Sequence, residues 1–147
     1  MTATLAIPVS IAKDLLTGAE WSPGDVRDLL HRTAEIKAGP ARFASVLRGK
    51  HIALIFEKPS LRTRVTFEVG IQSMGGFVVF LDHTQARLGE RESIPDVARN
   101  LQRWVHGIVA RVYEQRVLEG EFSFGRFGGG CFVVCGRAIL GSRKWRV

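Results

Sequence analysis

Cysteine is scarce in this sequence: there are 2 in 147 residues, Cys131 and Cys135, both near the C-terminus. Their C-x-x-x-C spacing differs from the C-x-x-C pairs of redox and zinc sites, and no second ligand pair follows. We therefore expect two unpaired thiols in a reducing compartment, and no metal site. The sequence also lacks an apolar run long enough to cross a bilayer, and residues 1–12 lack the basic start and apolar core of a signal peptide. These absences predict a cytoplasmic protein that does not enter a membrane.

Acidic residues are missing after Glu121, whereas five basic residues follow it: Arg126, Arg137, Arg143, Lys144 and Arg146. The formal net charge of +7 and the pI near 10.2 suggest a polyanion partner such as nucleic acid. Removing the +5 of residues 122–147 leaves only +2 for residues 1–121. The charge therefore belongs mostly to the tail. Because the chain has no recognised nucleic-acid module and no interleaved aromatic and basic repeats, we expect no nucleic-acid partner.

The composition is that of a globular chain, 46% hydrophobic and 24% charged, and its length suits one domain. Short apolar runs predict strands at 51–56, 77–81 and 107–112, the first two of them buried. Serine caps, glycine stops and apolar periodicity predict helices at 22–39, 62–74 and 93–104. Ser22 and Ser93 would cap the first and third helices, and Gly75-Gly76 would end the second. The apolar face of the first helix would consist of Val26, Leu29, Leu30, Thr33 and Ala34. We also expect a helical turn around residues 11–16, a small segment at 41–47 and the start of another helix at 117–121.

This alternation of strands and helices predicts an α/β fold in which a parallel sheet carries helices on both faces. In such sheets ligands bind beyond the carboxyl ends of the strands, which here are residues 57–64, 82–91 and 111–115. After residue 121 the periodicity fails, and residues 120–147 hold 7 of the 16 glycines. The fold is therefore expected to be incomplete at its C-terminus.

The stretch Ser60-Leu-Arg-Thr-Arg64 follows the first predicted strand and opens a helix. Backbone N–H groups in the first turn of a helix have no internal partners, and the helix dipole makes that end partly positive, so an anion is favoured there. The hydroxyls of Ser60 and Thr63 and the guanidinium groups of Arg62 and Arg64 would add donors suited to phosphate. The alternative is that Ser60 only caps the helix and that the arginines are solvated.

The segment Phe56-Glu-Lys-Pro-Ser-Leu-Arg-Thr-Arg-Val-Thr-Phe-Glu68 resembles the carbamoyl-phosphate motif of the aspartate/ornithine carbamoyltransferase family. Two later segments, Asp96–Leu101 and Ile108–Tyr113, fit the same family in the same order, and Lys58 resembles its ornithine branch. The likeness covers roughly residues 5–120, the whole of the family's carbamoyl-phosphate domain. It implies an enzyme of arginine biosynthesis and the urea cycle that needs no cofactor or metal. In that reaction the neutral δ-amine of ornithine attacks the carbonyl carbon of carbamoyl phosphate, phosphate leaves and citrulline forms.

The resemblance also implies roles for individual residues. The phosphate group would be held by three side chains and one backbone N–H, those of Ser60, Arg62, Thr63 and Leu61 respectively. Family members often carry Thr in place of Leu61, and we expect the contact to survive because it is made largely through the backbone. Arg111 would reach the phosphate and the carbonyl oxygen, so Arg62 and Arg111 would be the catalytic residues.

The loop at 82–91 resembles the family's mobile loop, which reaches into the site of a neighbouring subunit in a homotrimer. The ornithine branch usually places Gln directly before a Leu-Gly or Ile-Gly pair, whereas here Arg87 takes that place and Gln85 lies two residues earlier. Either residue remains a candidate for the contact, and Arg87 would either serve the phosphate as a cation or be solvated. Arg64 is expected to be packed or ion-paired behind the site.

Two features of the family are missing. Its His-Pro-x-Gln motif, which binds the carbamoyl group, has no counterpart because no histidine follows His106, and the four histidines are expected at the surface or in packing. The ornithine-binding half is missing too. We therefore divide the chain into a carbamoyl-phosphate-binding domain at 1–121 and an atypical Gly/Arg-rich tail at 122–147, hypothesised to be out of frame or disordered. The chain alone is expected to transfer no carbamoyl group, and the alternative is a non-catalytic fragment that binds phosphate or joins trimers.

Overall fold

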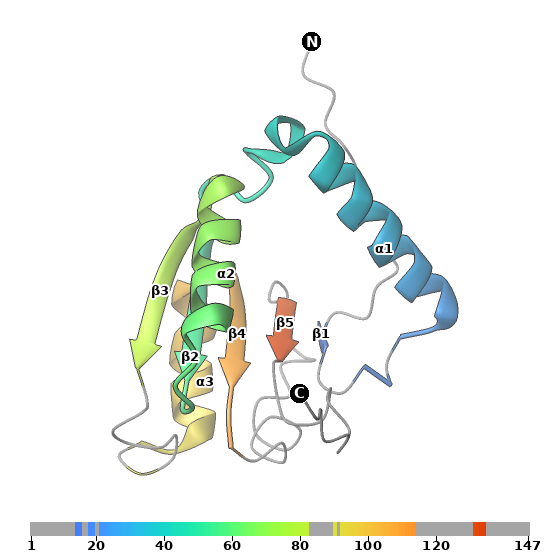
Figure 1. Ribbon diagram of the computed structural model, residues 1–147. Helices are drawn as coiled ribbons and strands as arrows, with labels where there is room; N and C mark the ends of the chain where they lie inside the picture. The colour runs from blue at the N-terminus through green and yellow to red at the C-terminus, as the bar shows by residue number, and fades with distance from the viewer. Residues whose placement is uncertain are drawn as a thin grey trace.

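A computed structural model of the chain describes residues 14–15, 18–19, 21–82, 90, 92–113 and 131–134. Within these residues, five parallel strands form one sheet in the order β1-β5-β4-β2-β3, accompanied by three α-helices and one 3-10 helix (Figure 1). The elements are β1 (Asp14–Leu15), α1 (Pro23–Ala38), η1 (Pro40–Phe43), β2 (His51–Phe56), α2 (Leu61–Ser73), β3 (Phe77–Asp82), α3 (Ile94–Trp104), β4 (Gly107–Arg111) and β5 (Cys131–Val134).

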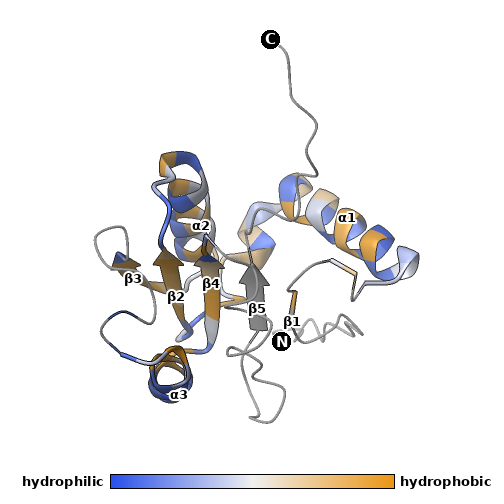
Figure 2. Ribbon diagram, turned by 90° about the horizontal axis from the view of Figure 1, so that it is seen from below, coloured by the Kyte–Doolittle hydropathy of each residue, from blue (hydrophilic) through white to orange (hydrophobic). Residues whose placement is uncertain are grey.

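Strands β2 and β4 form the centre of the sheet and are apolar on both faces. Successive side chains of a strand point to opposite faces, so each of these strands contributes side chains to a hydrophobic core on either face of the sheet. Ala53 and Ile55 pack with α3, whereas Leu54 and Phe56 pack with the α2 residue Ile71. Helices α2 and α3 accordingly cover opposite faces of the sheet (Figure 2). The predicted α/β fold with helices on both faces is confirmed.

The three predicted helices are confirmed with boundaries within two residues, and both predicted serine caps are present. In α1, Ser22 Oγ accepts from the Asp25 N–H at 3.2 Å, and Asp25 Oδ2 accepts from the Ser22 N–H at 2.8 Å. In α3, Ser93 Oγ accepts from the Asp96 N–H at 3.3 Å. The hydroxyl of Ser22, followed by its backbone N–H, holds the pKa of Asp25 below its ordinary value.

The end of α2 is set by the two glycines that the sequence singled out. Gly75 has a φ of +81°, a conformation that residues with a Cβ rarely adopt. Its N–H donates to the Gln72 carbonyl at 2.9 Å, and the Gly76 N–H donates to the Ile71 carbonyl at 2.9 Å. This pair of bonds is a Schellman motif, which satisfies the last carbonyls of the helix and turns the chain into β3.

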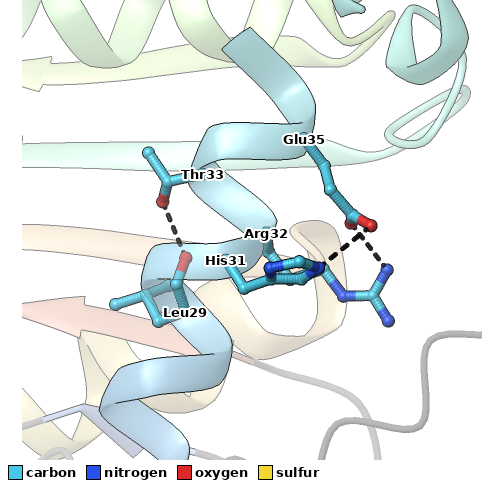
Figure 3. Close-up of polar contacts among 5 residues, drawn as sticks. All are labelled: Leu29, His31, Arg32, Thr33 and Glu35. Carbon is cyan, nitrogen blue, oxygen red and sulfur yellow. Dashed lines mark hydrogen bonds and ion pairs between the residues drawn. The ribbon is translucent and has the colours of Figure 1, made fainter. Parts of the chain in front are cut away.

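Helix α1 carries polar contacts between residues 29 and 35 (Figure 3). Glu35 pairs with Arg32 at 3.1 Å and with His31 at 3.5 Å, and the Thr33 hydroxyl donates to the Leu29 carbonyl at 2.8 Å. None of the residues of α1 is buried. The part of the chain that the structure describes therefore leaves uncovered the apolar face predicted for this helix, which consists of Val26, Leu29, Leu30, Thr33 and Ala34.

Strand β3 differs from the prediction of a buried strand. It lies at the edge of the sheet with β2 as its one neighbour among the described strands, and Phe77 and Val79 are 55% and 37% exposed. The apolar run correctly marks a strand, but α3 packs over β2 and β4 and leaves these two side chains outside its core. An apolar run alone does not distinguish a central strand from an edge strand.

The first and last strands were not predicted. Asp14–Leu15 pairs in parallel with β5, so the helical turn expected around residues 11–16 is wrong at these two positions. Cys131–Val134 forms a strand inside the segment expected to be irregular, paired with β4 on its other side. The predicted start of a helix at 117–121 lies outside the described residues. In the described part of the chain, no helix is both long and apolar enough to span a membrane.

Candidate functional site

The N-terminus of α2 lies at the carboxyl edge of the sheet, directly after β2. Ser60 precedes the helix in an extended conformation, with φ −161° and ψ 90°, and its side chain makes no capping bond. The first intrahelical bond runs from the Arg64 N–H to the Ser60 carbonyl at 3.1 Å. The N–H groups of residues 61–63 therefore lack intrahelical acceptors, and the dipole favours negative charge beside them. Ser60 therefore does not cap this helix through its side chain, so that part of the alternative is wrong.

Arg111 brings positive charge to this helix end from the neighbouring strand. It is the last residue of β4, level with Phe56 in the register of β2 and β4, and it is half-buried. Its Nη1 donates to Ser60 Oγ and, at 3.1 Å, to Thr63 Oγ1. Because both hydroxyl oxygens accept from Arg111, each hydroxyl keeps its proton to donate to an anion. Three predicted site residues are thus brought together from two elements.

Arg64 lies behind this cluster, as the sequence predicted. Its Nε donates to Glu68 Oε1 at 2.8 Å, and its guanidinium carbon lies 3.6 Å from the centre of the Phe80 ring. The contact with Phe80 ties α2 to the edge strand β3, whereas the ion pair with Glu68 lies within α2. Arg64 is therefore engaged in an ion pair and a cation–π contact within the fold.

The remaining predicted residues are placed differently. Arg62 is exposed, and within the described residues its guanidinium has no hydrogen bond or ion pair. The side chain of Leu61 is 78% exposed, while its N–H belongs to the uncapped first turn. Gln85 and Arg87 lie outside the described residues, so the predicted loop contact stays a prediction.

Glu57 is a site neighbour that the sequence did not single out. It is only 4% exposed, and among the described residues it is the one charged residue that is buried. Its N–H donates to the Arg111 carbonyl at 2.9 Å, and its Oε2 accepts from the Tyr113 N–H at 2.8 Å. The available signal was a carboxylate directly after a buried strand and three residues before Ser60.

An apolar cavity of about 350 Å³ lies at the opposite, amino end of the central strands. Lys50 and His106 are the ionisable groups in its lining, and no hydroxyl or helix N-terminus contributes to it. It therefore offers an anion much less than the cluster at the carboxyl edge. The lining residues are Val46, Leu47, Lys50, Ile52, Phe67, Ile71, His106, Gly107, Ile108 and Val109.

The described histidines lie at the surface or in packing, as expected. His31 is exposed on α1, and the His51 ring stacks on Phe77 with their centroids 5.1 Å apart. His106 Nδ1 accepts from the His51 N–H at 3.2 Å. His83 lies outside the described residues. Across the residues that the structure describes, no three His, Cys, Asp or Glu gather into a possible metal site.

Comparison with protein families gives a match over most of the chain. The model described as "Aspartate/ornithine carbamoyltransferase, carbamoyl-P binding domain" matches residues 13–126. The chain is 45% identical over 113 residues to ornithine carbamoyltransferase from Vibrio sp. (strain 2693), covering 77% of this chain and 38% of that protein. The enzyme from Moritella abyssi gives the same values. The chain therefore spans less than two fifths of the length of these relatives.

Solved structures with the same arrangement point the same way. The crystal structure of ornithine carbamoyltransferase from Thermus thermophilus superposes with a TM-score of 0.72 at 38% identity, covering 85% of this chain and 43% of that one. An acetylornithine transcarbamylase complexed with acetylcitrulline superposes with a TM-score of 0.69 at 30% identity, covering 85% of this chain and 42% of that one. The described sheet and its helices thus match the N-terminal part of these enzymes.

Proposed function

The chain belongs to the aspartate/ornithine carbamoyltransferase family through its carbamoyl-phosphate-binding domain, and from that premise we propose that it binds carbamoyl phosphate at the carboxyl edge of β2 and β4. The observation that carries this proposal is the contact of Arg111 with Ser60 and Thr63 beside an uncapped helix N-terminus. A phosphate group there would meet a cation, two hydroxyl donors and backbone N–H groups. These are the groups with which proteins commonly hold phosphate.

The proposed division of labour follows from the positions of these groups. Ser60, Thr63 and the backbone N–H of Leu61 would hold the phosphate oxygens. Arg62 is exposed at the same helix end, from which its guanidinium would close over the phosphate from solvent. Arg111 would contact both the phosphate and the carbonyl oxygen, where it would stabilise the negative charge that develops as the phosphate leaves.

In a complete enzyme of this family the reaction would be carbamoyl transfer to ornithine. The neutral δ-amine would form a bond to the carbonyl carbon, the bond from that carbon to the phosphate oxygen would break, and the amine would lose a proton as citrulline forms. Positioning and charge stabilisation by cations would lower the barrier. The activity would serve arginine biosynthesis or the urea cycle in the cytoplasm, and the family resemblance suggests a homotrimer.

The chain by itself supplies half of such a site. It contains no His-Pro-x-Gln sequence, and it spans 38% of the relatives' length. This favours a second candidate function, a non-catalytic fragment that binds phosphate or associates with trimers. An assay of citrulline formation from carbamoyl phosphate and ornithine distinguishes the two: the fragment forms no citrulline, and turnover by the isolated chain would contradict this.

The binding proposal can be tested by isothermal titration calorimetry with carbamoyl phosphate. Removal of a charged hydrogen-bond donor costs about 1.5–3 kcal/mol, so Arg62→Ala should weaken binding about tenfold or more. Arg103→Ala is the matched control, because it removes the same charge from the last turn of α3, at the amino edge of the sheet. Affinity that does not respond to Arg62→Ala would remove Arg62 from the site. No saturable binding by the unaltered chain would reject the proposed function.

A further inference from the structure

Glu57 is in an unusual position for a carboxylate. It follows β2 directly and is 4% exposed, and the other buried side chains in the described part of the chain are apolar. A buried carboxylate loses its hydration and persists only where hydrogen bonds replace the lost water. The contacts of Glu57 should therefore account for its burial.

Those contacts join the two segments that form the proposed anion site, the loop from β2 to α2 and the end of β4. Through its backbone, the Glu57 N–H donates to the Arg111 carbonyl at 2.9 Å, which extends the pairing of β2 and β4 by one step. Through its side chain, Oε2 accepts from the Tyr113 N–H at 2.8 Å. The two bonds lie on either side of Val112, which is itself 1% exposed. The segment 111–113 is thus held at both ends by one residue.

The next residue adds a second contact between the same segments. The Lys58 ammonium lies 4.7 Å from the centre of the Tyr113 ring, within the range of a cation–π contact. Two consecutive side chains of the loop that leads from β2 to α2 therefore contact the segment at the end of β4. Of these two side chains, the Glu57 carboxylate bonds to the backbone N–H of Tyr113, and the Lys58 ammonium contacts its ring.

These contacts between the loop and the end of β4 affect the anion site, because the Arg111 side chain bonds to residues at the end of the same loop. Its Nη1 donates to the hydroxyls of Ser60, three residues after Glu57, and of Thr63. The guanidinium can meet both hydroxyls only while the end of β4 and the start of α2 keep their spacing. Loss of the bond from the Tyr113 N–H would allow the end of β4 to move relative to the loop. Hydrogen bonds weaken steeply away from their best distance and angle, so such a movement would weaken the contacts of the Arg111 guanidinium.

From these contacts we infer that Glu57 is a positioning residue of the anion site: its carboxylate fixes the end of β4 against the β2–α2 loop, and thereby sets where the Arg111 guanidinium meets Ser60 and Thr63. The inference rests on the proposed function, because it concerns affinity for carbamoyl phosphate. It adds to that function a residue that does not touch the ligand and acts through Arg111.

The test measures the dissociation constant of carbamoyl phosphate for the 147-residue chain and its variants, by calorimetry for tight binding and by phosphorus NMR for millimolar binding. Glu57→Ala should weaken binding about tenfold. Glu57→Gln should remain within about threefold of the unaltered chain, because its amide oxygen can still accept from the Tyr113 N–H. Glu68→Ala is the charge-matched control on α2, and its affinity should stay within about twofold.

A double-mutant cycle separates positioning from a general loss of fold. In an Arg111→Ala background, Glu57→Ala should cost no further affinity, because the group it positions is gone. Equal losses in both backgrounds, or no loss with Glu57→Ala alone, would overturn the inference while carbamoyl-phosphate binding stands. If Glu57→Ala does not fold, Glu57→Asp takes its place, since the shorter carboxylate cannot reach Tyr113, and unchanged affinity would then overturn the inference. No binding by the unaltered chain would overturn the proposed function and this inference with it.

Discussion

Replacement of glycine by alanine is expected to lower the free energy of unfolding at two positions of this chain and to raise it at a third. Gly75 follows α2 with a φ of +81°, Gly49 precedes β2 with a φ of +72°, and Gly70 lies inside α2 with an ordinary helical conformation. A Cβ on Gly75 would lie 2.8 Å from the carbonyl oxygen of Ala44, whereas nothing lies within 4 Å of a Cβ on Gly49 or Gly70. The backbone conformation and the close contact can therefore be measured separately.

The magnitudes follow from these geometries. The left-handed conformation costs a residue with a Cβ about 1–2 kcal/mol, which is the whole expected loss for Gly49→Ala. Gly75→Ala should lose more, because the Ala44 carbonyl belongs to the backbone and cannot rotate away as a side chain would. Gly70→Ala should instead gain about 0.5–1 kcal/mol, since alanine is the better helix former and its methyl group has space.

Urea unfolding followed by circular dichroism at 222 nm measures the free energy of unfolding of the three variants and the unaltered chain. The expected order of stability is Gly70→Ala, unaltered chain, Gly49→Ala and Gly75→Ala, from highest to lowest. Gly75→Ala as stable as Gly49→Ala would show that the Ala44 contact is relieved at no cost. If Gly75→Ala were as stable as the unaltered chain, the left-handed conformation at this position would carry no cost for a residue with a Cβ.

Three further predictions concern the core, the cap of α1 and the tail. Leu54 of β2 is fully buried in the core between the sheet and α2, so Leu54→Ala should cost about 2–5 kcal/mol in urea unfolding, and a loss below about 1 kcal/mol would contradict its place in the core. The pKa of Asp25 is lowered chiefly by the Ser22 hydroxyl, so its contribution to the cap is present above about pH 4 and lost as the pH falls through the lowered value. An NMR titration should show this shift, and Ser22→Ala should move the pKa of Asp25 back towards its ordinary value; an equal pKa in both chains would contradict the assignment. Sequencing of the coding DNA should reveal an alternative reading frame beyond residue 121 that encodes His-Pro-x-Gln and a second domain, and its absence would contradict the hypothesis of an out-of-frame tail.

Much of the fold could be predicted because its signals are local. The apolar run at 51–56 coincides with β2, and serine caps and glycine stops place the helix ends within two residues. The order in which strands lie side by side is not a local property. For that reason an edge strand such as β3, with the same apolar run as a central strand, was expected to be buried. Strands β1 and β5 are short, and they form through pairing with distant strands, β1 with β5 and β5 with β4, which no periodicity reveals.

The candidate site could be predicted only where its residues lie close together in the sequence or match the family motif. Ser60 and Thr63 belong to one continuous motif, and Arg111 follows from the family resemblance. The structure adds the contact between Arg111 and the two hydroxyls, and it shows that the Ser60 hydroxyl faces Arg111 and makes no capping bond to its own helix. The role of Glu57 could not be predicted, because its partner Tyr113 lies 56 residues away in the sequence.

We propose that carbamoyl phosphate binds where β2 and β4 meet the start of α2. A titration of the 15N-labelled chain with carbamoyl phosphate, and separately with inorganic phosphate, tests this site through the backbone amide signals. We expect saturable shifts at Leu61, Arg62 and Thr63 and at Arg111, with the amides around the apolar cavity at the other end of the sheet unchanged. No saturable shift, or shifts confined to that cavity at residues such as Ile71, would show that carbamoyl phosphate does not bind at this edge.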